Sequence, residues 1–406
     1  MEAVAHCVLP PGSVMNKFLT QRIISFLLLQ VTLLDATAQT AVPVFTSGKE
    51  GYQSYRIPAI IRLKDHSLLA FCEGRLSSAA DFGNIDIVMK RSSDLGKTWT
   101  PLQVIVNESN LQAGNPAPVV DWLDPDFPDG RIFLFYNTGT NHEAEVARGN
   151  GIRECKFICS TDGGKSWSVP VNITSQVHRP LQEAINPAYR FREDWRTYAN
   201  TPGHGLQISE GPYKGRIYIA ANHSEAGPQP GAGHYRAHGY YSDDHGRSFQ
   251  LAASLPFPGS NESTAAMLDN GGLLLNARNQ SGTPRVRIVA RSKDGGSSWD
   301  SVYFDHQLPD PVCQGTLLNA GKIRGRNVLL FCNAGDSMGR DQLTLRISRD
   351  EGRTWTRSIL IDKDPMPRKN HDYTAYSDMV MTAKRETAVL YERNNYSEIV
   401  YRIINW

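Results

Sequence analysis

The sequence predicts an all-β protein, a six-bladed β-propeller with four-stranded antiparallel blades. One short turn motif recurs five times along the chain. Apolar, strand-like runs recur between the copies, and no clear amphipathic helix interrupts them. The stretch between successive copies can hold several short strands, which is typical of propeller blades. The 34 glycines and 23 prolines among 406 residues fit such a turn-rich chain.

The recurring motif has the form Ser-x-Asp-x-Gly-x-(Ser/Thr)-Trp, with Phe replacing Trp in one copy. Its aspartate can accept hydrogen bonds from N–H groups of its own turn, and its glycine tolerates backbone angles that other residues resist. The aromatic residue can return to pack between strands. We therefore expect these residues to shape turns and to take no part in chemistry. The copies begin at Ser92, Ser160, Ser242, Ser292 and Ser348.

Alternating apolar runs between the motifs predict the number of blades. Six such runs follow polar or glycine-rich turns, at residues 68–71, 132–136, 217–221, 273–276, 328–331 and 389–391. The last run of the chain, Glu398–Ile404, is expected to pair near the first strand, Val42–Phe45, which would leave no open sheet edge. No linker is evident, so residues 40–406 are predicted to form one domain.

The N-terminus predicts an export signal. Residues 15–22 are basic, residues 23–34 are apolar, and residues 36–38 provide a small-residue cleavage site. The apolar run is shorter than the ~20 residues of a spanning helix, which favours a removed signal over a membrane anchor. Residues 1–39 are therefore expected to be removed, with the start codon at Met1 or Met15. The mature protein would be periplasmic or secreted in a bacterium, and lysosomal or extracellular in a eukaryote.

Composition excludes several classes of function. The net charge of +2 gives no broad basic field that would attract nucleic acid or acidic membranes. Of six cysteines, Cys7 falls in the leader, and the odd remainder is a poor disulfide framework without metal-type spacing. We expect buried free thiols, no metal and no cofactor.

The segment Tyr55-Arg56-Ile57-Pro58 follows the first predicted strand. It resembles the F/Y-R-I-P motif of sialidases, and the five turn motifs have the form of Asp boxes. Together they make the chain similar to the bacterial-type sialidases (neuraminidases) of glycoside hydrolase family 33. The resemblance covers nearly the whole mature chain. It implies the sialidase propeller fold and a retaining exo-α-sialidase that removes terminal sialic acid from glycoproteins, glycolipids and oligosaccharides through a covalent tyrosyl intermediate.

The resemblance implies three arginines that bind the sugar carboxylate: Arg56, Arg278 and Arg340. A planar guanidinium binds a carboxylate bidentately and stays charged at any relevant pH. Arg346 competes with Arg340 for the third position. Arg75 matches a further family arginine that reaches the sugar.

Tyr376 matches the family nucleophile, with Tyr373 as a neighbour that could be confused with it. A neutral phenol avoids the repulsion that a carboxylate would meet beside the carboxylate of the substrate, and sialidases are the tyrosine exception among glycosidases. A phenol with pKa ≈ 10 needs a base, and Glu262 matches the family glutamate in that role. Glu392 matches the glutamate that orients Arg56.

Asp81 matches the acid/base aspartate that protonates the leaving group and later activates water. Asp86 is the alternative, although its strand-like surroundings favour a structural role. The resemblance places Trp195, Tyr198 and the turn from Thr201 to Gly205 near the glycerol and N-acyl groups of the sugar. This turn has Thr-Pro-Gly where the family usually has Gly-Pro-Gly, and His204 is either a substrate contact or a turn histidine.

Two alternative functions remain. Asp boxes alone would also fit a non-catalytic propeller that binds a glycan or a protein, and a trans-sialidase would share every residue named above. The joint presence of Asp81, Glu262 and Tyr376 with the three arginines favours the hydrolase. Two glycosylation sequons, at Asn261 and Asn279, adjoin the predicted site and favour a bacterial source. The oligomeric state is left open.

Overall fold

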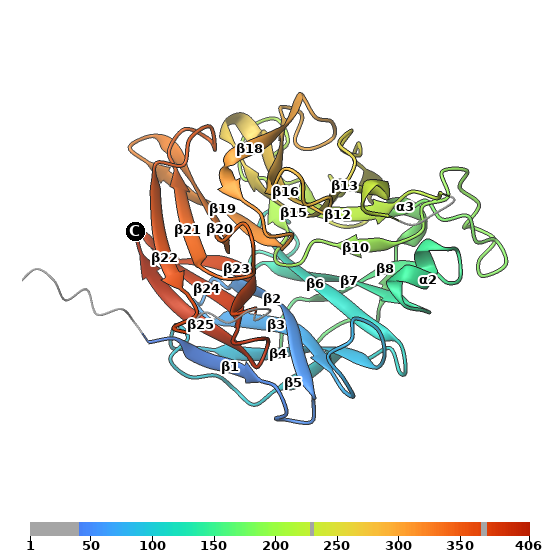
Figure 1. The fold of residues 1–406 in the computed structure, drawn as a ribbon, viewed down its shortest axis with the longest axis horizontal. Helices are drawn as coiled ribbons and strands as arrows, with labels where there is room; N and C mark the ends of the chain where they lie inside the picture. The colour runs from blue at the N-terminus through green and yellow to red at the C-terminus, as the bar shows by residue number, and fades with distance from the viewer. Residues whose placement is uncertain (1–39, 228–230, 367–371) are drawn as a thin grey trace, which may run out of the picture. The chain divides into compact units, whose positions relative to one another are not determined.

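The computed structural model describes residues 40–227, 231–366 and 372–406 (Figure 1). Residues 41–406 form one compact unit, and the predicted export signal, residues 1–39, lies outside the described residues. The described chain is all-β, as predicted. Its helices are the short α2 (Glu143–Ala147) and α3 (Thr174–Val177) and the 3₁₀ turns η1 (Ala232–His234) and η2 (Asp269–Gly271). No described helix has the length and apolar character that a membrane span requires.

Three of the sheets have four antiparallel strands each, in the orders β1-β25-β24-β23, β15-β16-β17-β18 and β19-β20-β21-β22. Four-stranded antiparallel sheets agree with the prediction. The strands of these sheets are β1 (Val42–Thr46), β15 (Ser260–Met267), β16 (Leu273–Asn279), β17 (Val286–Ser292), β18 (Ser301–Pro309), β19 (Gly315–Ile323), β20 (Arg326–Ala334), β21 (Leu343–Ser348), β22 (Arg357–Asp362), β23 (Thr374–Ala383), β24 (Glu386–Arg393) and β25 (Glu398–Asn405).

The other two sheets are larger. A five-stranded sheet has the order β10-β12-β13-β14 with β11 paired to β12, and an eight-stranded sheet has the order β2-β3-β4-β6-β7-β8-β9 with β5 paired to β4. Their strands are β2 (Ser54–Arg62), β3 (Leu68–Arg75), β4 (Ile85–Ser92), β5 (Gln103–Val106), β6 (Gln112–Asp121), β7 (Arg131–Gly139), β8 (Arg153–Ser160), β9 (Val171–Asn172), β10 (Tyr198–Asn200), β11 (Leu206–Gln207), β12 (Ile217–Ser224), β13 (Tyr235–Ser242) and β14 (Gln250–Leu251).

The prediction of six four-stranded blades is wrong. The described strands form five sheets, because a parallel pair between Ile85 of β4 and Gln112 of β6 joins two runs of strands into the eight-stranded sheet. Alternation of apolar residues marks where strands lie along the chain. It does not determine whether a strand also pairs with a neighbour outside its own hairpin, which depends on the path of the connecting loop.

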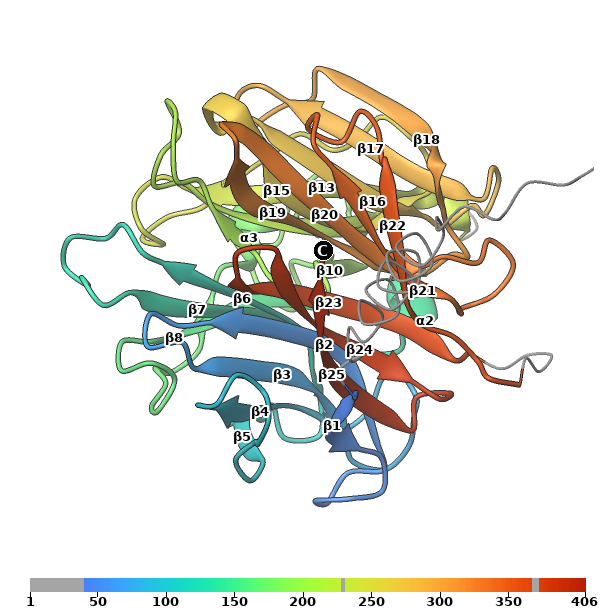
Figure 2. The same cartoon turned by 90° about the vertical axis from the view of Figure 1, so that its left-hand side faces the viewer.

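The two ends of the compact unit share one sheet. Strand β1 pairs antiparallel with β25, from Val42 opposite Tyr401 to Thr46 opposite Glu398. Figures 1 and 2 both show the blue β1 beside the red β25. This pairing confirms the predicted contact between the first and last strands of the described chain.

Bulges interrupt the strands that pack around a common centre. Strand β2 contacts β6 and β23, β15 contacts β12 and β19, and β19 contacts β23. The ladder register shifts between Arg56 and Ala59 in β2, between Ser260 and Ser263 in β15, and between Thr374 and Ser377 in β23. A bulge bends a strand and redirects a side chain out of the regular alternation. Arg56 lies at the edge of the first irregularity, and Glu262 and Tyr376 lie within the other two.

The repeated motif forms the predicted turns. In the first copy, the backbone N–H of Thr98 donates to Asp94 at 2.9 Å, and the backbone N–H of Gly96 donates to the Ser92 hydroxyl at 2.8 Å. Gly96 has φ 84°, a left-handed angle that favours glycine. Hydrogen bonds from Thr98 lower the pKa of Asp94 to about 2. Both Asp94 oxygens accept bonds within the turn, in keeping with a structural role.

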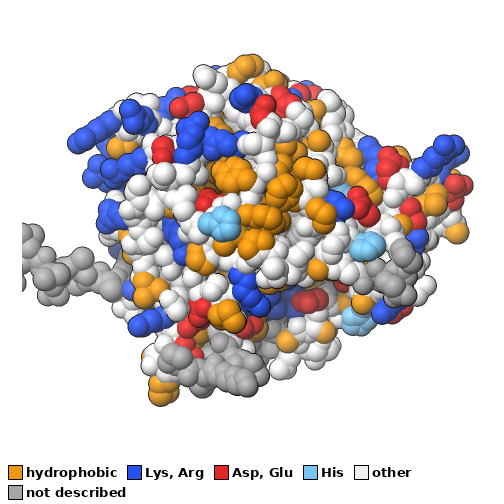
Figure 3. Space-filling view, turned by 45° about the horizontal axis from the view of Figure 1, so that its top comes forward, with side chains coloured by type: hydrophobic (Ala, Val, Ile, Leu, Met, Phe, Trp, Pro, Cys, Tyr) orange, Lys and Arg blue, Asp and Glu red, His pale blue; other side chains and the backbone are white. Residues whose placement is uncertain are grey.

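Surface charge is mixed. On the face seen in Figure 3, acidic side chains lie among basic ones, and hydrophobic side chains gather near the middle. The small net charge of +2 agrees with this distribution.

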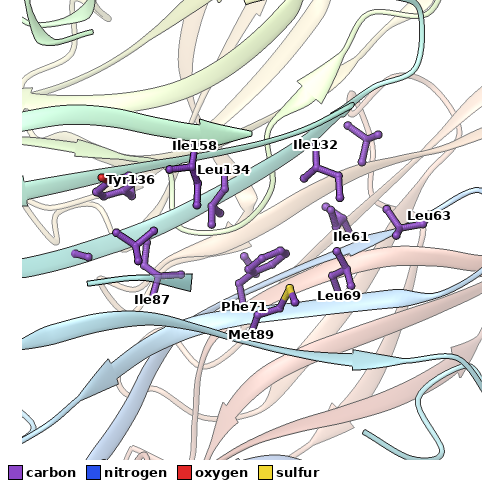
Figure 4. Packing of buried hydrophobic residues seen from close by; sticks show 14 residues of the cluster. Ile61, Leu63, Leu69, Phe71, Ile87, Met89, Ile132, Leu134, Tyr136 and Ile158 are labelled. Carbon is purple, nitrogen blue, oxygen red and sulfur yellow. The ribbon is translucent and has the colours of Figure 1, made fainter. Parts of the chain in front are cut away.

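Apolar side chains from the two runs of the eight-stranded sheet pack against one another. In Figure 4, Phe71 and Met89 face the cluster that contains Leu134 and Ile158. All four are buried, and each buried side chain of this size contributes about 1.5–3 kcal/mol relative to exposure.

The described cysteines are all free thiols. Cys159 is half-buried, and the others, Cys72, Cys155, Cys313 and Cys332, are buried. The prediction of buried free thiols is confirmed for these four, and Cys159 is more exposed than predicted.

Candidate active site

A polar pocket of about 250 Å³ gathers residues from β2, β3, β6 to β8, β10, β12, β13, β15, β16 and β23. The predicted catalytic residues and the four predicted sugar-binding arginines all line it, although they are spread over most of the chain. These are Arg56, Arg75, Asp81, Glu262, Arg278, Arg340 and Tyr376. Glu392 does not line it.

Tyr376, Glu262 and Arg278 form a hydrogen-bonded triangle in this pocket. The Tyr376 hydroxyl donates to Oε1 of Glu262 at 2.5 Å, and Nη1 of Arg278 donates to Oε2 of Glu262 at 2.7 Å. The same Nη1 lies 3.0 Å from the Tyr376 hydroxyl oxygen. A carboxylate therefore stands ready to accept the phenolic proton, and a cation lies beside the oxygen that would become charged.

Tyr376 is protonated at neutral pH. Burial and the nearby charge of Glu262 raise the pKa of its hydroxyl well above 10, although Arg278 and Arg340 oppose the shift. A phenol in this state attacks a carbon only if a base removes its proton during the step. Glu262 is the carboxylate within hydrogen-bond distance.

Glu392 lies behind the pocket and fixes Arg56. Its Oε1 accepts from Nε of Arg56 at 2.7 Å and from the backbone N–H of Ile57 at 2.9 Å, and its Oε2 accepts from the backbone N–H of Tyr376 at 3.2 Å. The Glu392 side chain is fully buried. One carboxylate thus links the first arginine to the backbone of the tyrosine.

The ring of Tyr396 supports two of the arginines. The Arg56 guanidinium carbon lies 4.0 Å from the ring centroid, and Nη1 of Arg340 donates to the Tyr396 hydroxyl at 2.9 Å. Arg340 also donates from Nη2 to the carbonyl of Val312 at 3.1 Å. Among the described residues, no carboxylate lies within ion-pair distance of Arg340.

Arg75 bridges two carboxylates on the other side of the pocket. Its Nη2 lies 2.8 Å from Oε2 of buried Glu73, and its Nη1 lies 2.7 Å from Oδ1 of Asp81. The Asp81 side chain is 85% exposed, so it stands at the mouth of the pocket, where a leaving group would depart.

The arginines around Asp81 favour the ionised form of its carboxyl. Desolvation raises the pKa of its carboxyl, but the charges of Arg75, Arg56 and Arg340 together lower it by more. An anion bound to these arginines would offset their charge, and the pKa of Asp81 would then rise. Occupancy of the pocket would thereby help Asp81 to hold a proton.

The competing candidates lie elsewhere. Asp86 accepts from the Tyr52 hydroxyl at 2.5 Å and from Asn107 at 2.7 Å, which is a structural role. Arg346 donates to Asn333 at 2.8 Å. Neither these two nor Tyr373 is among the residues that line the pocket.

Of the residues expected near the far end of the sugar, Tyr198 lines the pocket. Trp195 stacks on His223 with ring centroids 3.4 Å apart and is not part of the lining. Nδ1 of His204 lies 2.6 Å from Asp378, at a separate cavity of about 620 Å³ with mostly apolar walls. That cavity contains none of the predicted catalytic residues.

Several lining residues were missed by sequence reasoning. Glu73 adjoins the Arg75 motif, and its Oε1 accepts from the backbone N–H of Asn115 at 2.9 Å. Glu143, Arg153 and Tyr235 form part of the wall. Outside the lining, the backbone has positive φ angles at Asn394, Asn395 and Tyr396, and asparagine adopts such angles more readily than most residues other than glycine.

The described residues contain one group with the spacing of metal ligands, Asp121, Asp124 and His245, which lies outside the pocket. Nη2 of Arg131 lies 2.7 Å from Asp124 and 3.7 Å from Asp121. An internal cation therefore already compensates these carboxylates.

The sequence matches the BNR repeat-like domain family over residues 66–389. It is 32% identical over 367 residues to a sialidase of Micromonospora viridifaciens, with 85% of this chain and 51% of the relative covered. The chain thus spans about half the length of that relative. An exo-alpha-sialidase of Aspergillus fumigatus is 27% identical over 408 residues, with 92% of this chain and 89% of the relative covered.

Solved structures share the fold. The Hadza microbial sialidase Hz136 superimposes with a TM-score of 0.73 at 23% identity, covering 90% of this chain and 68% of the other. The intramolecular trans-sialidase from Ruminococcus gnavus, in complex with oseltamivir carboxylate, gives 0.68 at 15% identity, covering 91% and 98%.

Proposed function

This chain belongs to the sialidase family, and from that premise we propose that it is a retaining exo-α-sialidase that hydrolyses terminal sialic acid from glycans. The observation that carries the proposal is the 2.5 Å hydrogen bond from the Tyr376 hydroxyl to Glu262 in an arginine-rich pocket. Sialylated glycoproteins, glycolipids and oligosaccharides are the proposed substrates.

Charge complementarity supports binding of an anionic sugar. Arg56 and Arg278 each have a carboxylate partner, whereas Arg340 has none within ion-pair distance among the described residues. A substrate carboxylate would supply the missing charge and would receive N–H donors in a geometry that suits its oxygens. Arg340, the arginine that had a rival in the sequence, therefore has the strongest electrostatic reason to bind the substrate.

The first chemical step would join the sugar to Tyr376. Glu262 takes the phenolic proton while the phenolic oxygen forms a bond to the anomeric carbon and the glycosidic C–O bond breaks. Asp81 gives its proton to the departing oxygen, so the product leaves as an alcohol. Arg278 stabilises negative charge on the phenolic oxygen.

The second step would return every group to its starting state. Asp81, now ionised, removes a proton from water, whose oxygen attacks the anomeric carbon as its bond to Tyr376 breaks. The phenolate recovers its proton from Glu262. Two displacements at one carbon give net retention of configuration.

Two alternative functions, a non-catalytic binding propeller and a trans-sialidase, can be distinguished from the hydrolase. A non-catalytic propeller has no need to hold a tyrosine–glutamate pair in one pocket with three arginines. A trans-sialidase would use the same first step and pass the sugar to another hydroxyl, so the product distinguishes it from a hydrolase. We also propose export, for which the support is the pattern of residues 15–38 alone.

The proposal is tested with the full chain and an aryl α-sialoside. We expect free sialic acid as the main product and loss of turnover in Tyr376→Phe. Tyr136→Phe is a matched control, since the buried Tyr136 also donates to a glutamate, Glu108 at 2.7 Å, but lies outside the pocket. Absence of turnover by the wild-type protein would refute the proposed sialidase activity. Full turnover by Tyr376→Phe would refute the assignment of Tyr376 as the nucleophile.

A further inference from the structure

Arg153 is a buried cation in the wall of the pocket that the mechanism above does not use. It begins β8, opposite Gly139 of β7 in the antiparallel ladder, and is 3% exposed. Gly139 leaves room for the guanidinium, because a Cβ at this position would collide with Nη1 of Arg153. The local structure therefore accommodates this arginine closely.

The charge of Arg153 has no direct partner. Its Nη1 donates to the carbonyl of Asn141 at 2.7 Å, and no carboxylate lies within ion-pair distance among the residues that the structure describes. The other N–H groups of the guanidinium make no hydrogen bond within the described chain. They are also not fully enclosed, so a bound molecule can reach them. Burial lowers the pKa of the guanidinium, and the more distant Glu143, Tyr235 and Glu73 offset this only in part.

The surroundings of Arg153 differ from those of the arginine triad. Its charged and titratable neighbours are Glu143, Tyr235 and Glu73, whereas Arg56, Arg278 and Arg340 interact with Tyr376 or Tyr396. The Tyr235 hydroxyl donates to Glu143, which leaves the Glu143 carboxylate partly occupied. Arg153 enters the pocket from β8, whereas the triad comes from β2, β16 and the segment before β21, and Tyr235 lies within electrostatic range of both Arg153 and Arg278.

We propose that Arg153 is a specificity-determining residue that donates hydrogen bonds to a carbonyl or hydroxyl oxygen on a substituent of the sugar remote from its carboxylate. This inference rests on the proposed sialidase function. A buried guanidinium with free N–H groups gains most from an oxygen acceptor, because its desolvation is otherwise uncompensated. The substrate carboxylate is accounted for by the triad, so the acceptor must belong to another part of the sugar.

The first test replaces the side chain. Arg153→Gln is expected to raise KM about tenfold to hundredfold, the usual effect of losing a hydrogen bond from a charged donor, with kcat within about threefold. Arg153→Lys should recover part of the loss. Arg148→Gln is the matched control, because Arg148 is an exposed arginine that pairs with Glu145 and does not line the pocket.

The second test moves the guanidinium without removing its charge. Gly139→Ala places a methyl group against the flexible end of Arg153 and should also raise KM while the protein stays folded by circular dichroism. A purely structural Arg153 predicts a lower melting temperature with KM unchanged in both variants. KM within twofold of wild type in folded Arg153→Gln and Gly139→Ala would overturn the proposal.

Two substrates identify the acceptor. One aryl α-sialoside carries an N-acetyl group at C5 and the other a hydroxyl group. A loss in Arg153→Gln confined to the N-acetyl substrate identifies an acyl carbonyl, and a loss with both identifies a hydroxyl oxygen that they share. A wild-type protein that releases neither sugar would instead refute the proposed function and is distinguishable from either result.

Discussion

The hydroxyl of Tyr376 donates a 2.5 Å hydrogen bond to Glu262, a residue 114 positions away in the sequence. Arg278 donates to both partners. The three groups lie on β23, β15 and β16, and Glu262 and Tyr376 each lie within an irregularity of the strand register. This contact joins the proposed proton acceptor and the proposed nucleophile in one hydrogen-bonded unit, whose parts can be tested separately.

Glu262→Gln should lower kcat about 10²–10⁴-fold, because an amide cannot accept the phenolic proton. The measurement is kcat with an aryl α-sialoside, with the fold checked by circular dichroism. Glu108→Gln is the control, since Glu108 accepts a hydrogen bond from Tyr136 in a similar way. A folded Glu262→Gln with kcat within threefold of wild type would contradict the role of the base.

Asp81→Asn should act according to the leaving group. In kcat/KM, which reports the first step, we expect a loss of more than about 100-fold with a sialyl-galactoside and less than about tenfold with an activated aryl leaving group, which needs little protonation. The ratio of the two rates is the readout. Asp86→Asn should lower the melting temperature and leave the ratio unchanged, because Asp86 bonds to Tyr52 and Asn107. Equal losses on both substrates in Asp81→Asn would refute the assignment.

Glu392→Gln should destabilise the protein by about 3–5 kcal/mol, because it removes the charge that compensates buried Arg56. Urea unfolding measures the change. KM should also rise, since Arg56 and the backbone at Tyr376 lose a common support. A change in the free energy of unfolding below about 1 kcal/mol would show that Arg56 is held by other contacts.

The His204–Asp378 pair should make stability depend on pH. Burial lowers the pKa of the His204 imidazole, but the charge and hydrogen bond of Asp378 raise it by more, so the folded-state pKa lies above the ordinary value. The stabilisation is fully present below the unfolded pKa of about 6.5 and is lost as pH rises through the folded value. The free-energy advantage of wild type over His204→Asn should be larger at acidic than at alkaline pH. An advantage that grows with pH would reverse the inferred sign.

The buried thiols should resist a thiol reagent in the native state. Burial raises the pKa of Cys313 and of Cys155 to about 11 and that of Cys332 to about 12, so little thiolate exists at pH 8. Among the described cysteines, half-buried Cys159 should react first. Ellman's reagent, with and without urea, measures this order. Rapid modification of Cys313 in the folded protein would contradict it.

Local sequence was enough to predict the turns. In each turn motif, the donors and acceptors lie within a few residues of one another, as in the bonds among Ser92, Asp94 and Thr98. The contact between the first and last strands was also predictable, because both are apolar runs at the ends of the domain. The residues that carry the proposed chemistry were identified by resemblance, and the structure places them around one pocket.

Only the tertiary structure decided which strands pair across loops and which buried charges have partners. Whether β4 would pair with β6 depended on where the loop between them leads, and this overturned the predicted six blades. Arg153 has no motif of its own, and its importance arises from burial, from Gly139 beneath it and from the lack of a nearby carboxylate. The sequence alone determined which residues can form turns or carry protons. Three-dimensional packing determined which charges are compensated, because ion pairing depends on distances between residues far apart in the chain.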